Sequence, residues 1–363
     1  MKVLLVAGIY PPDVGGPATF LPQLAAHCQA SGHQVKVLTL SDKPEDSRTP
    51  SCWKVIRIPR RLPLPIRFSM STALVFVYSI LGYRVFANGL HEECGLALWL
   101  SRGKGVAKIV GDPIWERSTN KLRTTLDIEA FNSAQLPWNI DIQRRLLKFG
   151  LNQFHTIITP SQQLQNLVIK WRVKSKLEVI PNGVSIKNLI KQEKPIDVIT
   201  VCRLVKWKNV DLLIESANIF GFSLCVVGDG PEQSKLALAA KGNPKIDIRG
   251  RLGQDEVDEL LSSSKVFALI SDYEGLSFSL LQAMSNGLPV GVSNTSGNKD
   301  VVKKAGNGLI VDTKSTELIG SSIQDLLENK RLRQKFSSNS LTSIKNFYDI
   351  EICLEKTTQT LAV

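Results

Sequence analysis

The sequence lacks the patterns by which proteins bind structural metals or form disulfide frameworks. Its 363 residues include six cysteines but no C-x-x-C pair, and no D-x-D motif stands in a loop suited to metal binding. Zinc-binding and disulfide-rich chains are recognised by closely spaced cysteines. We therefore expect reduced, mostly buried thiols and no metal site. The cysteines are Cys28, Cys52, Cys94, Cys202, Cys225 and Cys353.

Long hydrophobic runs are absent as well. The apolar stretch 73–81 is followed by Gly82 and Arg84, so it is shorter than the roughly 20 residues that a membrane-spanning helix needs. We expect a core helix or an interfacial helix there. Residues 1–7 lead directly into a glycine-rich loop without a small-residue cleavage site, which favours a buried strand over a signal peptide. The sequence predicts a cytoplasmic protein, either free or peripheral on the inner face of the cell membrane.

Aromatic residues are scarce and positive charge is unevenly distributed. The net charge is +12, and residues 1–190 hold 24 Lys and Arg against 12 Asp and Glu, whereas the remainder holds 21 of each. A basic half indicates an anionic partner: a membrane surface, a phosphorylated acceptor or nucleic acid. Nucleic acid is disfavoured, because the 7% of aromatic residues are not interleaved with the cations. We expect docking on anionic membranes through the arginines between 57 and 67 and the apolar stretch after them, with a phosphorylated soluble acceptor as the alternative.

Short apolar runs alternate with segments of helical period along the whole chain, which is typical of parallel sheets covered by helices. The pattern predicts an α/β protein with two Rossmann-like, doubly wound domains that face each other across a cleft. We expect domains over 1–190 and 191–345, a linker near 187–195, and a C-terminal helix over 346–363 that packs back on the first domain. The predicted strands are 3–7, 35–40, 55–59, 84–88, 107–110 and 156–159, then 198–202, 224–227, 245–248, 266–270, 289–292 and 309–311.

Two helices are marked clearly by their apolar spacing and their first residues. Leu164, Leu167, Val168 and Trp171 follow the i, i+3, i+4, i+7 pattern behind a predicted Ser161 cap. A second set, over 210–217, stands behind Asn209, which we expect to cap it in the same way.

Three loops at predicted strand ends have glycine or charge patterns that bear on phosphate binding, and the first two have residues suited to it. The first, 10–17, contains the paired glycines Gly15 and Gly16 before a helix, where backbone N–H groups can approach an anion. The second, 202–209, carries Arg203, Lys206 and Lys208, whose charges can neutralise a diphosphate. The third, 226–232, departs from G-x-G-x-x-G spacing, so a nicotinamide enzyme is disfavoured.

The fourth loop, 271–290, is the most specific. A strand ends, Glu274 sits in a glycine loop, a helix opens, and Gly287-Leu288-Pro289 closes it before another strand. The helix N-terminus offers N–H groups to an anion, while the Glu274 carboxylate can accept hydrogen bonds from a polyol. A helix from 274 to Gln282 spans about 12 Å, which is the reach from the sugar to the ribose of one nucleotide sugar.

Taken together, these loops resemble those of the family 4 retaining glycosyltransferases of GT-B fold. The likeness covers nearly the whole chain and rests on the Pro-Pro-x-x-Gly-Gly loop near the N-terminus, the fourth loop, and segments 159–161, 180–184, 203–208, 227–232 and 250–252. It implies donor-binding roles for Gly15, Gly16, Arg203, Lys208, Arg251, Leu252, Glu274, Gly275, Leu276, Ser277 and Gln282. Arg203 and Lys208 would hold the diphosphate, Gly16 would meet it from the other domain, and the backbone near Arg251 and Leu252 would receive the base.

The chain departs from the family pattern at two places. The family has a second glutamate eight residues after the one matching Glu274, which binds the ribose diol, and this chain has Gln282 there. We expect Gln282→Glu to keep or tighten donor binding. The family also has a His after the fifth strand of the first domain, where this chain reads Gly111-Asp112-Pro113. Asp112 is the first candidate for a catalytic residue beside Glu274, with Glu116 and His91 as further candidates.

The resemblance implies transfer of a hexose from a UDP- or GDP-sugar to a lipid-linked or saccharide acceptor, with retention, in cell-envelope polysaccharide or glycolipid synthesis. Electrostatic stabilisation of the departing diphosphate would replace a metal, and the resemblance implies no cofactor besides the nucleotide-sugar donor. Two alternatives stay open: a nucleotide-sugar epimerase of the same fold, and a catalytically impaired sugar-nucleotide binder, which the loss of the second glutamate suggests.

Overall fold

A computed structural model describes residues 1–13, 15–43, 52–121, 123–186, 194–294, 296–313 and 315–363. The chain forms two compact units: unit 1 comprises Met1–Pro181 and Glu351–Val363, and unit 2 comprises Asn182–Ile350. Unit 1 therefore ends its first segment earlier than residue 190, and it also includes the end of the chain. Most of the predicted linker, residues 187–193, lies outside the described residues.

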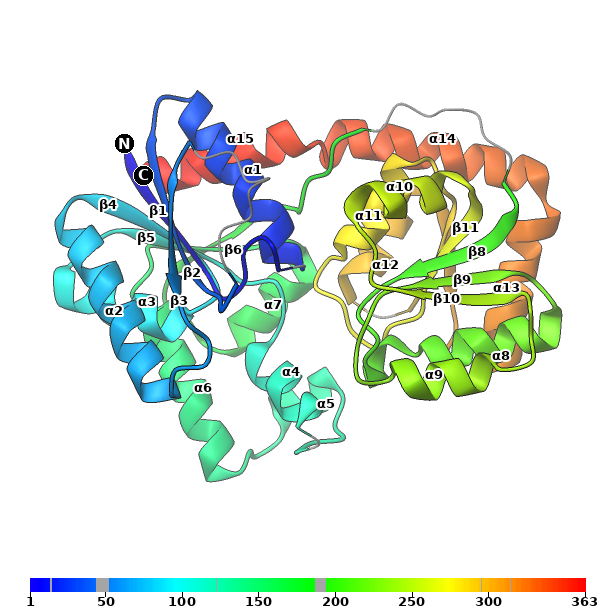
Figure 1. Ribbon diagram of the computed structural model, residues 1–363, viewed down its shortest axis with the longest axis horizontal. Helices are drawn as coiled ribbons and strands as arrows, with labels where there is room; N and C mark the ends of the chain where they lie inside the picture. The colour runs from blue at the N-terminus through cyan, green and yellow to red at the C-terminus, as the bar shows by residue number, and fades with distance from the viewer. Residues whose placement is uncertain (14, 44–51, 122, 187–193, 295, 314) are drawn as a thin grey trace. The chain divides into compact units, whose positions relative to one another are not determined.

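Unit 1 is built on a parallel sheet of seven strands in the order β3-β2-β1-β4-β5-β6-β7 (Figure 1). The central strand β1 pairs with β2 and β4, with Leu5 opposite Val37 and Phe86. Its residues from Val3 onward are fully buried, as expected of a strand covered on both faces. The strands are β1 (Lys2–Ala7), β2 (Gln34–Leu40), β3 (Lys54–Ile58), β4 (Tyr83–Asn88), β5 (Gly105–Lys108), β6 (Thr156–Thr159) and β7 (Lys176–Val179).

The helices of unit 1 lie on both faces of this sheet (Figure 1). The first and last helices pack together, because His27 contacts Glu351 and Glu355, each at 3.3 Å. The helices are α1 (Gly16–Ala30), α2 (Leu64–Ile80), α3 (His91–Ser101), α4 (Pro113–Asn120), α5 (Ile128–Ser133), α6 (Trp138–Leu151), α7 (Gln162–Lys170) and α15 (Ile350–Ala362).

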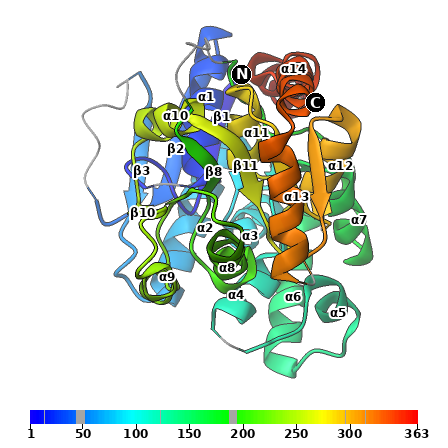
Figure 2. The ribbon, with the colours of Figure 1, turned by 90° about the vertical axis from the view of Figure 1, so that its right-hand side faces the viewer.

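Unit 2 repeats the plan with a six-stranded sheet in the order β10-β9-β8-β11-β12-β13. Helices α8 and α13 pack side by side on one face (Figure 2), and α10, α11, α12 and α14 cover the other. The strands are β8 (Ile196–Val201), β9 (Leu224–Val227), β10 (Ile246–Gly250), β11 (Ser264–Leu269), β12 (Val290–Ser293) and β13 (Gly308–Val311). The helices are α8 (Val210–Phe220), α9 (Gln233–Ala240), α10 (Gln254–Ser262), α11 (Phe278–Ser285), α12 (Ser296–Ala305), α13 (Thr316–Glu328), α14 (Lys330–Phe347) and the 3₁₀ turn η1 (Lys206–Lys208).

The predicted strands are confirmed to within two residues at each end, and the largest shift is that of 107–110, which is displaced by two residues at both ends because β5 is Gly105–Lys108. The Ser161 cap is also confirmed, since its Oγ accepts the Leu164 N–H at 3.2 Å. The Asn209 cap is wrong. Asn209 adopts a left-handed conformation (φ 50°) with no capping side-chain bond, and its amide is used elsewhere in the fold.

The apolar stretch 73–81 belongs to α2, which begins much earlier, at Leu64. Across the part of the chain that the structure describes, no helix is both long and apolar enough to span a bilayer.

Candidate functional site

Two loops of unit 2 leave neighbouring strands at the point where the strand order reverses. Strand β8 pairs with β11, with Ile199 opposite Phe267, while β9 and β12 continue the sheet in opposite directions. Open parallel sheets bind ligands beyond the carboxyl ends of the strands at this reversal. Loop 202–209 follows β8 and loop 270–277 follows β11, so the fold brings the second and fourth loops of the sequence to one place.

Hydrogen bonds join these two loops. The Asp272 N–H donates to the Trp207 carbonyl at 2.8 Å. The Asn209 amide donates to the Ile270 carbonyl at 3.1 Å and to the Asp272 carboxylate at 2.6 Å. Asn209 is thus used to connect the loops, which explains why it does not cap α8.

The centre of the site is an ion pair between Lys208 and Glu274, both of which are largely shielded from solvent. The Ser271 hydroxyl donates to the same Glu274 oxygen at 2.9 Å. Burial raises the pKa of the neighbouring Cys202 thiol to about 11, so this cysteine is protonated at neutral pH and is no thiolate nucleophile. The arrangement holds one cation and one carboxylate, which can respectively bind a phosphate oxygen and accept hydroxyl hydrogen bonds.

Glycines make the close approach of the neighbouring loops possible. A Cβ on Gly228 would lie 1.8 Å from the Cys202 carbonyl oxygen, and one on Gly230 would lie 2.2 Å from that of Leu204. The Leu204 N–H donates to the Asp229 carbonyl at 2.8 Å. The glycines of loop 226–232 therefore serve to position the cationic loop.

Helix α11 begins at Phe278, four residues after Glu274, and is capped by Ser277. The Ser277 Oγ accepts the Leu280 N–H at 3.3 Å, and the Ser277 N–H donates to Asn298 at 3.1 Å. Gly275 and Leu276 are buried, and the Leu276 carbonyl accepts a hydrogen bond from Asn182 at 3.0 Å. The N-terminus of α11 is thus fixed beside the ion pair.

Gln282 lies further along α11 and contacts a carboxylate that sequence reasoning missed. Its Nε2 donates to Asp258 of α10 at 2.8 Å, and Asn286 donates to the same oxygen at 3.3 Å. Asp258 stands 24 positions before Gln282 on another helix, so no local pattern reveals the contact. A negative charge is therefore present beside residue 282 although its own side chain is neutral.

The other predicted donor residues lie at the same edge of the unit 2 sheet. Arg203 is exposed and has no ion-pair partner among the described residues. Arg251 follows β10 and is exposed, while Leu252 packs partly against the hydrophobic core.

In unit 1, Gly15 and Gly16 begin helix α1. Gly15 has a φ of 146°, and a Cβ there would lie 2.7 Å from Ile9 Cδ1, so the position requires glycine. The loop before it is held by two arginines. Arg57 donates to the Pro11 carbonyl at 3.0 Å, and Arg60 binds the Asp13 carboxylate at 2.6 Å. These arginines therefore support the glycine loop.

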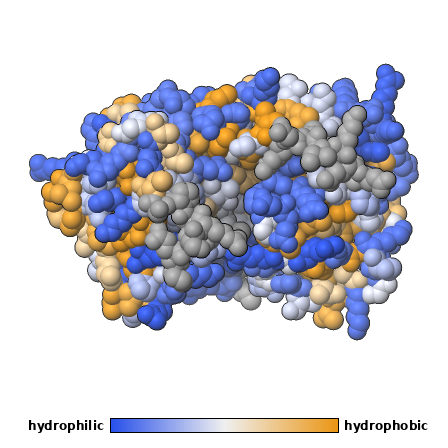
Figure 3. Space-filling model, turned by 45° about the horizontal axis from the view of Figure 1, so that its top comes forward, coloured by the Kyte–Doolittle hydropathy of each residue, from blue (hydrophilic) through white to orange (hydrophobic). Residues whose placement is uncertain are grey.

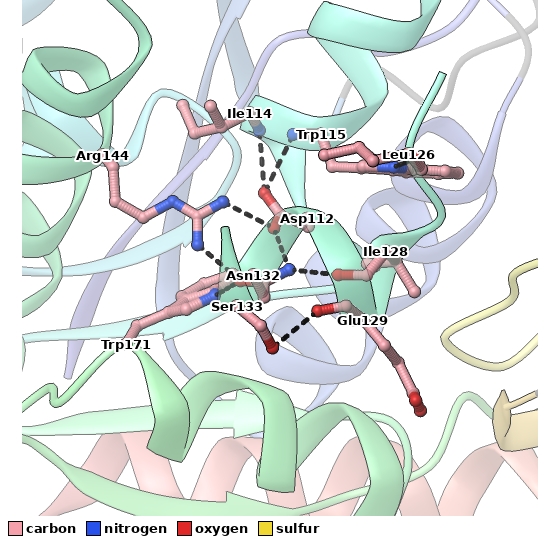
Figure 4. Close-up of polar contacts among 10 residues, drawn as sticks. All are labelled: Asp112, Ile114, Trp115, Leu126, Ile128, Glu129, Asn132, Ser133, Arg144 and Trp171. Carbon is pink, nitrogen blue, oxygen red and sulfur yellow. Dashed lines mark hydrogen bonds and ion pairs between the residues drawn. The ribbon is translucent and has the colours of Figure 1, made fainter. Parts of the chain in front are cut away.

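Asp112, the first catalytic candidate, is fully buried and occupied by structural contacts (Figure 4). One carboxylate oxygen caps α4 by accepting the N–H groups of Ile114 and Trp115 at 3.0 and 3.1 Å. The other accepts from Asn132 at 3.1 Å and from Arg144 at 3.0 Å. With four donors and no solvent exposure, the Asp112 carboxylate is engaged in structural contacts, which do not favour the catalytic role expected from the sequence.

The other candidates of unit 1 have different environments. His91 is buried, its Nε2 lies 3.2 Å from the Lys108 carbonyl oxygen, and burial lowers its pKa. Glu116 is partly exposed in the first turn of α4. Glu93, which the sequence did not single out, is buried in α3, and burial raises its pKa to about 7.

Comparison with protein-family models now identifies the chain. Residues 15–183 match the Glycosyl transferase 4-like domain, and residues 184–342 match the Glycosyl transferases group 1 domain. The chain belongs to the group 1 glycosyltransferases.

The curated relatives of this group 1 glycosyltransferase include proteins with different donors. The GDP-mannose-dependent alpha-mannosyltransferase of Mycolicibacterium smegmatis is 24% identical over 363 residues, covering 91% of this chain and 90% of that protein. The GtfA subunit of the UDP-N-acetylglucosamine–peptide N-acetylglucosaminyltransferase of Streptococcus pneumoniae is 24% identical over 73% of this chain and 55% of the subunit. The chain spans about half the length of several other curated relatives, between 46% and 56%.

Solved structures show the same fold over the whole chain. A sucrose-phosphate synthase from Thermosynechococcus elongatus superimposes with a TM-score of 0.80 at 17% identity, covering 99% of this chain and 97% of that one. HepE of Anabaena, solved with UDP and glucose, superimposes with a TM-score of 0.79 at 17% identity, covering 100% and 99%. The group 1 glycosyltransferase described here therefore has the GT-B fold, with two Rossmann-like domains.

Proposed function

We propose that this protein transfers a hexose from a UDP- or GDP-sugar to a lipid-linked or saccharide acceptor, with retention at the anomeric carbon, as a family 4 enzyme of cell-envelope polysaccharide or glycolipid synthesis. The observation that carries the proposal is the Lys208–Glu274 ion pair at the strand-order reversal of unit 2. A buried cation beside a carboxylate matches a ligand that has both phosphate and hydroxyl groups.

The donor diphosphate would be bound by Arg203 and Lys208. The Lys208 ammonium has three N–H donors, so it can keep its bond to Glu274 while it donates to a phosphate oxygen. As the bond between the anomeric carbon and the diphosphate breaks, negative charge grows on the leaving oxygen. Fixed cations and the N-terminus of α11 would stabilise that charge without a metal.

The sugar and nucleoside would lie on either side of the diphosphate. Glu274 would accept hydrogen bonds from the sugar hydroxyls, with Gly275, Leu276 and Ser277 forming the wall of that subsite. Gln282 would contact the ribose diol, and the nearby Asp258 carboxylate supports this role because it supplies the charge that Gln282 lacks. Arg251 and Leu252 would border the base, and Gly15 and Gly16 stay predicted donor-binding residues of unit 1.

The acceptor side would belong to unit 1. The excess of basic residues in the N-terminal half supports an anionic acceptor or membrane surface, and hence a peripheral place on the inner face of the cell membrane.

Donor titration and product analysis test the proposal. We expect at least one of UDP-glucose and GDP-mannose to bind in calorimetry, with the nucleoside diphosphate released when an acceptor is added. The anomeric coupling constant of the product, measured by NMR, should match that of the donor. A protein that binds neither nucleotide sugar would contradict the proposed donor site.

The two alternatives give different results in the same experiment. An epimerase would convert the donor to an isomer without any acceptor. A catalytically impaired binder would retain affinity for the donor but release no nucleoside diphosphate with any acceptor.

A further inference from the structure

Large apolar side chains are exposed on neighbouring helices of unit 1. Helix α6 exposes Trp138, Ile142, Leu146 and Phe149, and Trp138 and Leu146 keep 80% and 55% of their surface accessible. Trp99 and Leu100 of α3 are also exposed, and the Trp99 ring contacts that of Phe149 at 6.1 Å. We call these six residues the apolar face. A contiguous exposed apolar surface is a mark of an interaction site.

Helix α6 separates this face cleanly from the core. Its buried residues Ile140, Leu147 and Leu151 lie on the opposite side of the helix from Ile142 and Leu146 at 100° per residue. Apolar side chains on the outer side of a helix are unfavourable in water, so their presence here indicates that another apolar surface covers them. Its 14 residues give a length of about 21 Å, enough to lie flat in an interface.

Cations border the apolar face along one side. Arg144, Arg145, Lys148 and Lys170 line a cavity of about 530 Å³ between α5, α6 and α7, with Asp141 as its acidic residue. Arg144 is bound to Asp112 and Arg145 to Asp141, at 3.0 and 2.7 Å. The cavity therefore keeps a positive balance through Lys148 and Lys170, next to the apolar stripe.

Helix α2 adds to the same apolar character. Met70, Val77 and Ile80 recur on one side of α2, and all three are exposed. Figure 3 shows orange, hydrophobic residues among the blue, hydrophilic ones along the left-hand margin of the face that it draws.

We propose that the apolar face inserts into the interfacial region of an anionic lipid bilayer, while Lys148 and Lys170 bind lipid phosphate groups. The inference rests on the proposed peripheral membrane location, and it names the surface of the protein that contacts the membrane. An apolar helix stripe with a basic flank is the pattern of helices that lie in a membrane interface. A second copy of the chain is a poorer occupant, because a self-complementary contact would bring like charges together.

This surface differs from the one that the basic run of the sequence suggested. Arg57 and Arg60 donate to the glycine loop, Arg60 as an ion pair with Asp13, so both guanidinium groups are held within unit 1. The lipid contact is therefore assigned to α6 and α3 instead of to the arginines between 57 and 67.

Co-sedimentation with vesicles of equal parts phosphatidylglycerol and phosphatidylcholine tests the proposal. We expect the wild type to bind at about 0.15 M salt, and to bind much less to phosphatidylcholine alone. Lys148→Ala should weaken the partition about five-fold, as one basic residue near an anionic surface contributes about 1 kcal/mol. Leu146→Ser combined with Ile142→Ser should reduce binding at least as much.

Matched controls come from α9 of unit 2. Leu238 is 70% exposed and Lys241 is exposed beside it, so Leu238→Ser and Lys241→Ala should leave the partition unchanged. Trp138→Phe should keep binding but reduce the blue shift of fluorescence, to which both Trp138 and Trp99 contribute when they enter the lipid. Donor affinity in calorimetry should be the same in all variants, which separates this proposal from the proposed donor site.

Three results would overturn the proposal. The first is a wild type that does not sediment with the anionic vesicles. The second is equal binding by the α6 and α9 variants. The third is a dimer without lipid that becomes monomeric on Leu146→Ser, which would assign the apolar face to a second copy of the chain.

Discussion

At the residue scale, the proposed donor site has few charged side chains, so the loss of one is not compensated by another. Lys208 is the cation that contacts Glu274, and Arg203 stands exposed in the same loop. Lys206 is also exposed in that loop, but no role in donor binding is proposed for it. The loop thus contains its own control residue.

We predict that Arg203→Ala and Lys208→Ala each weaken donor binding by about 1.5–3 kcal/mol, because each leaves a phosphate charge without its partner. That range corresponds to about ten- to more than one hundred-fold in affinity. Calorimetric titration with the bound nucleotide sugar measures it. Lys206→Ala should change affinity little, and near-normal titrations of both other variants would remove the diphosphate from this loop.

A second prediction at this scale concerns Gln282, and here the structure changes the expectation drawn from the sequence. Gln282→Glu would place a second carboxylate beside Asp258, whose oxygen now lies 2.8 Å from the Gln282 amide. Like charges at that distance repel, so we expect the single variant to bind donor more weakly. Adding Asp258→Asn should restore affinity, since the double variant carries one carboxylate and one amide again.

The same titrations include Gln282→Ala, which should cost roughly 0.5–1.5 kcal/mol for each hydrogen bond lost. Equal donor affinity in all four proteins would mean that neither side chain meets the ribose.

At the scale of elements, helix α4 is fixed to α5 and α6 through one buried carboxylate. Asp112 caps α4 and binds Asn132 and Arg144, and Trp171 donates to Asn132 at 2.8 Å (Figure 4). The Arg144 guanidinium also lies over the Phe131 and Trp171 rings, at 5.3 and 5.5 Å. The network therefore links helices α4, α5 and α6 to Trp171 at the end of α7 through side chains, without any strand pairing between them.

We predict that Asp112→Ala lowers the free energy of unfolding by about 3–5 kcal/mol, because it leaves Arg144 largely buried without its counter-ion and removes the cap. Asp112→Asn should cost less, since its amide oxygen can still cap α4. Urea unfolding measures both. A fully stable Asp112→Ala protein that loses only sugar transfer would return Asp112 to a catalytic role.

At the scale of the whole molecule, two buried ionisable groups of unit 1 should give stability a pH dependence. Burial raises the pKa of Glu93 from 4.5 to about 7 and lowers that of Lys108 from 10.5 to about 7. Lys108 Nζ has no hydrogen-bond partner in the described structure and lies 3.7 Å from the Phe20 ring centroid. In the folded protein Glu93 is therefore neutral below about pH 7, and Lys108 is neutral above about pH 7.

The signs follow from proton binding. Between pH 4.5 and 7 the unfolded Glu93 has lost its proton and the folded one has not, so stability falls as pH rises. Between pH 7 and 10.5 the unfolded Lys108 keeps its proton and the folded one does not, so stability rises with pH. We predict that Glu93→Gln removes the fall and Lys108→Met removes the rise, measured as unfolding free energy against pH. Unchanged slopes would show that the two groups are solvated in the folded protein.

Most of the fold was predictable because buried parallel strands are short, continuous apolar runs. Strand β7 was missed since Lys176–Val179 is a half-exposed edge strand with alternating polar residues. The start of α2 was missed because polar and proline residues precede its apolar part.

Within the site, the loops were predictable from glycine and charge, but their contacts were not. Neither the Asp258–Gln282 hydrogen bond nor the burial of Asp112 could be predicted from the sequence, because both depend on side chains far apart in the chain. Asn209 failed as a cap for the same reason, because its partners lie more than 60 positions away.

The division of the chain determines the order in which the units can be completed during translation. Unit 2 is continuous from Asn182 to Ile350, whereas unit 1 needs Glu351–Val363 after it. Domains generally fold as they emerge from the ribosome, so unit 2 has all its residues first. Unit 1 can be completed only after α15 has been synthesised. Until then, the surface on which α15 buries Cys353, Leu354 and Leu361 stays exposed. A chain that ends before residue 351 and has been released from the ribosome should therefore present this apolar surface to chaperones while unit 2 is already folded.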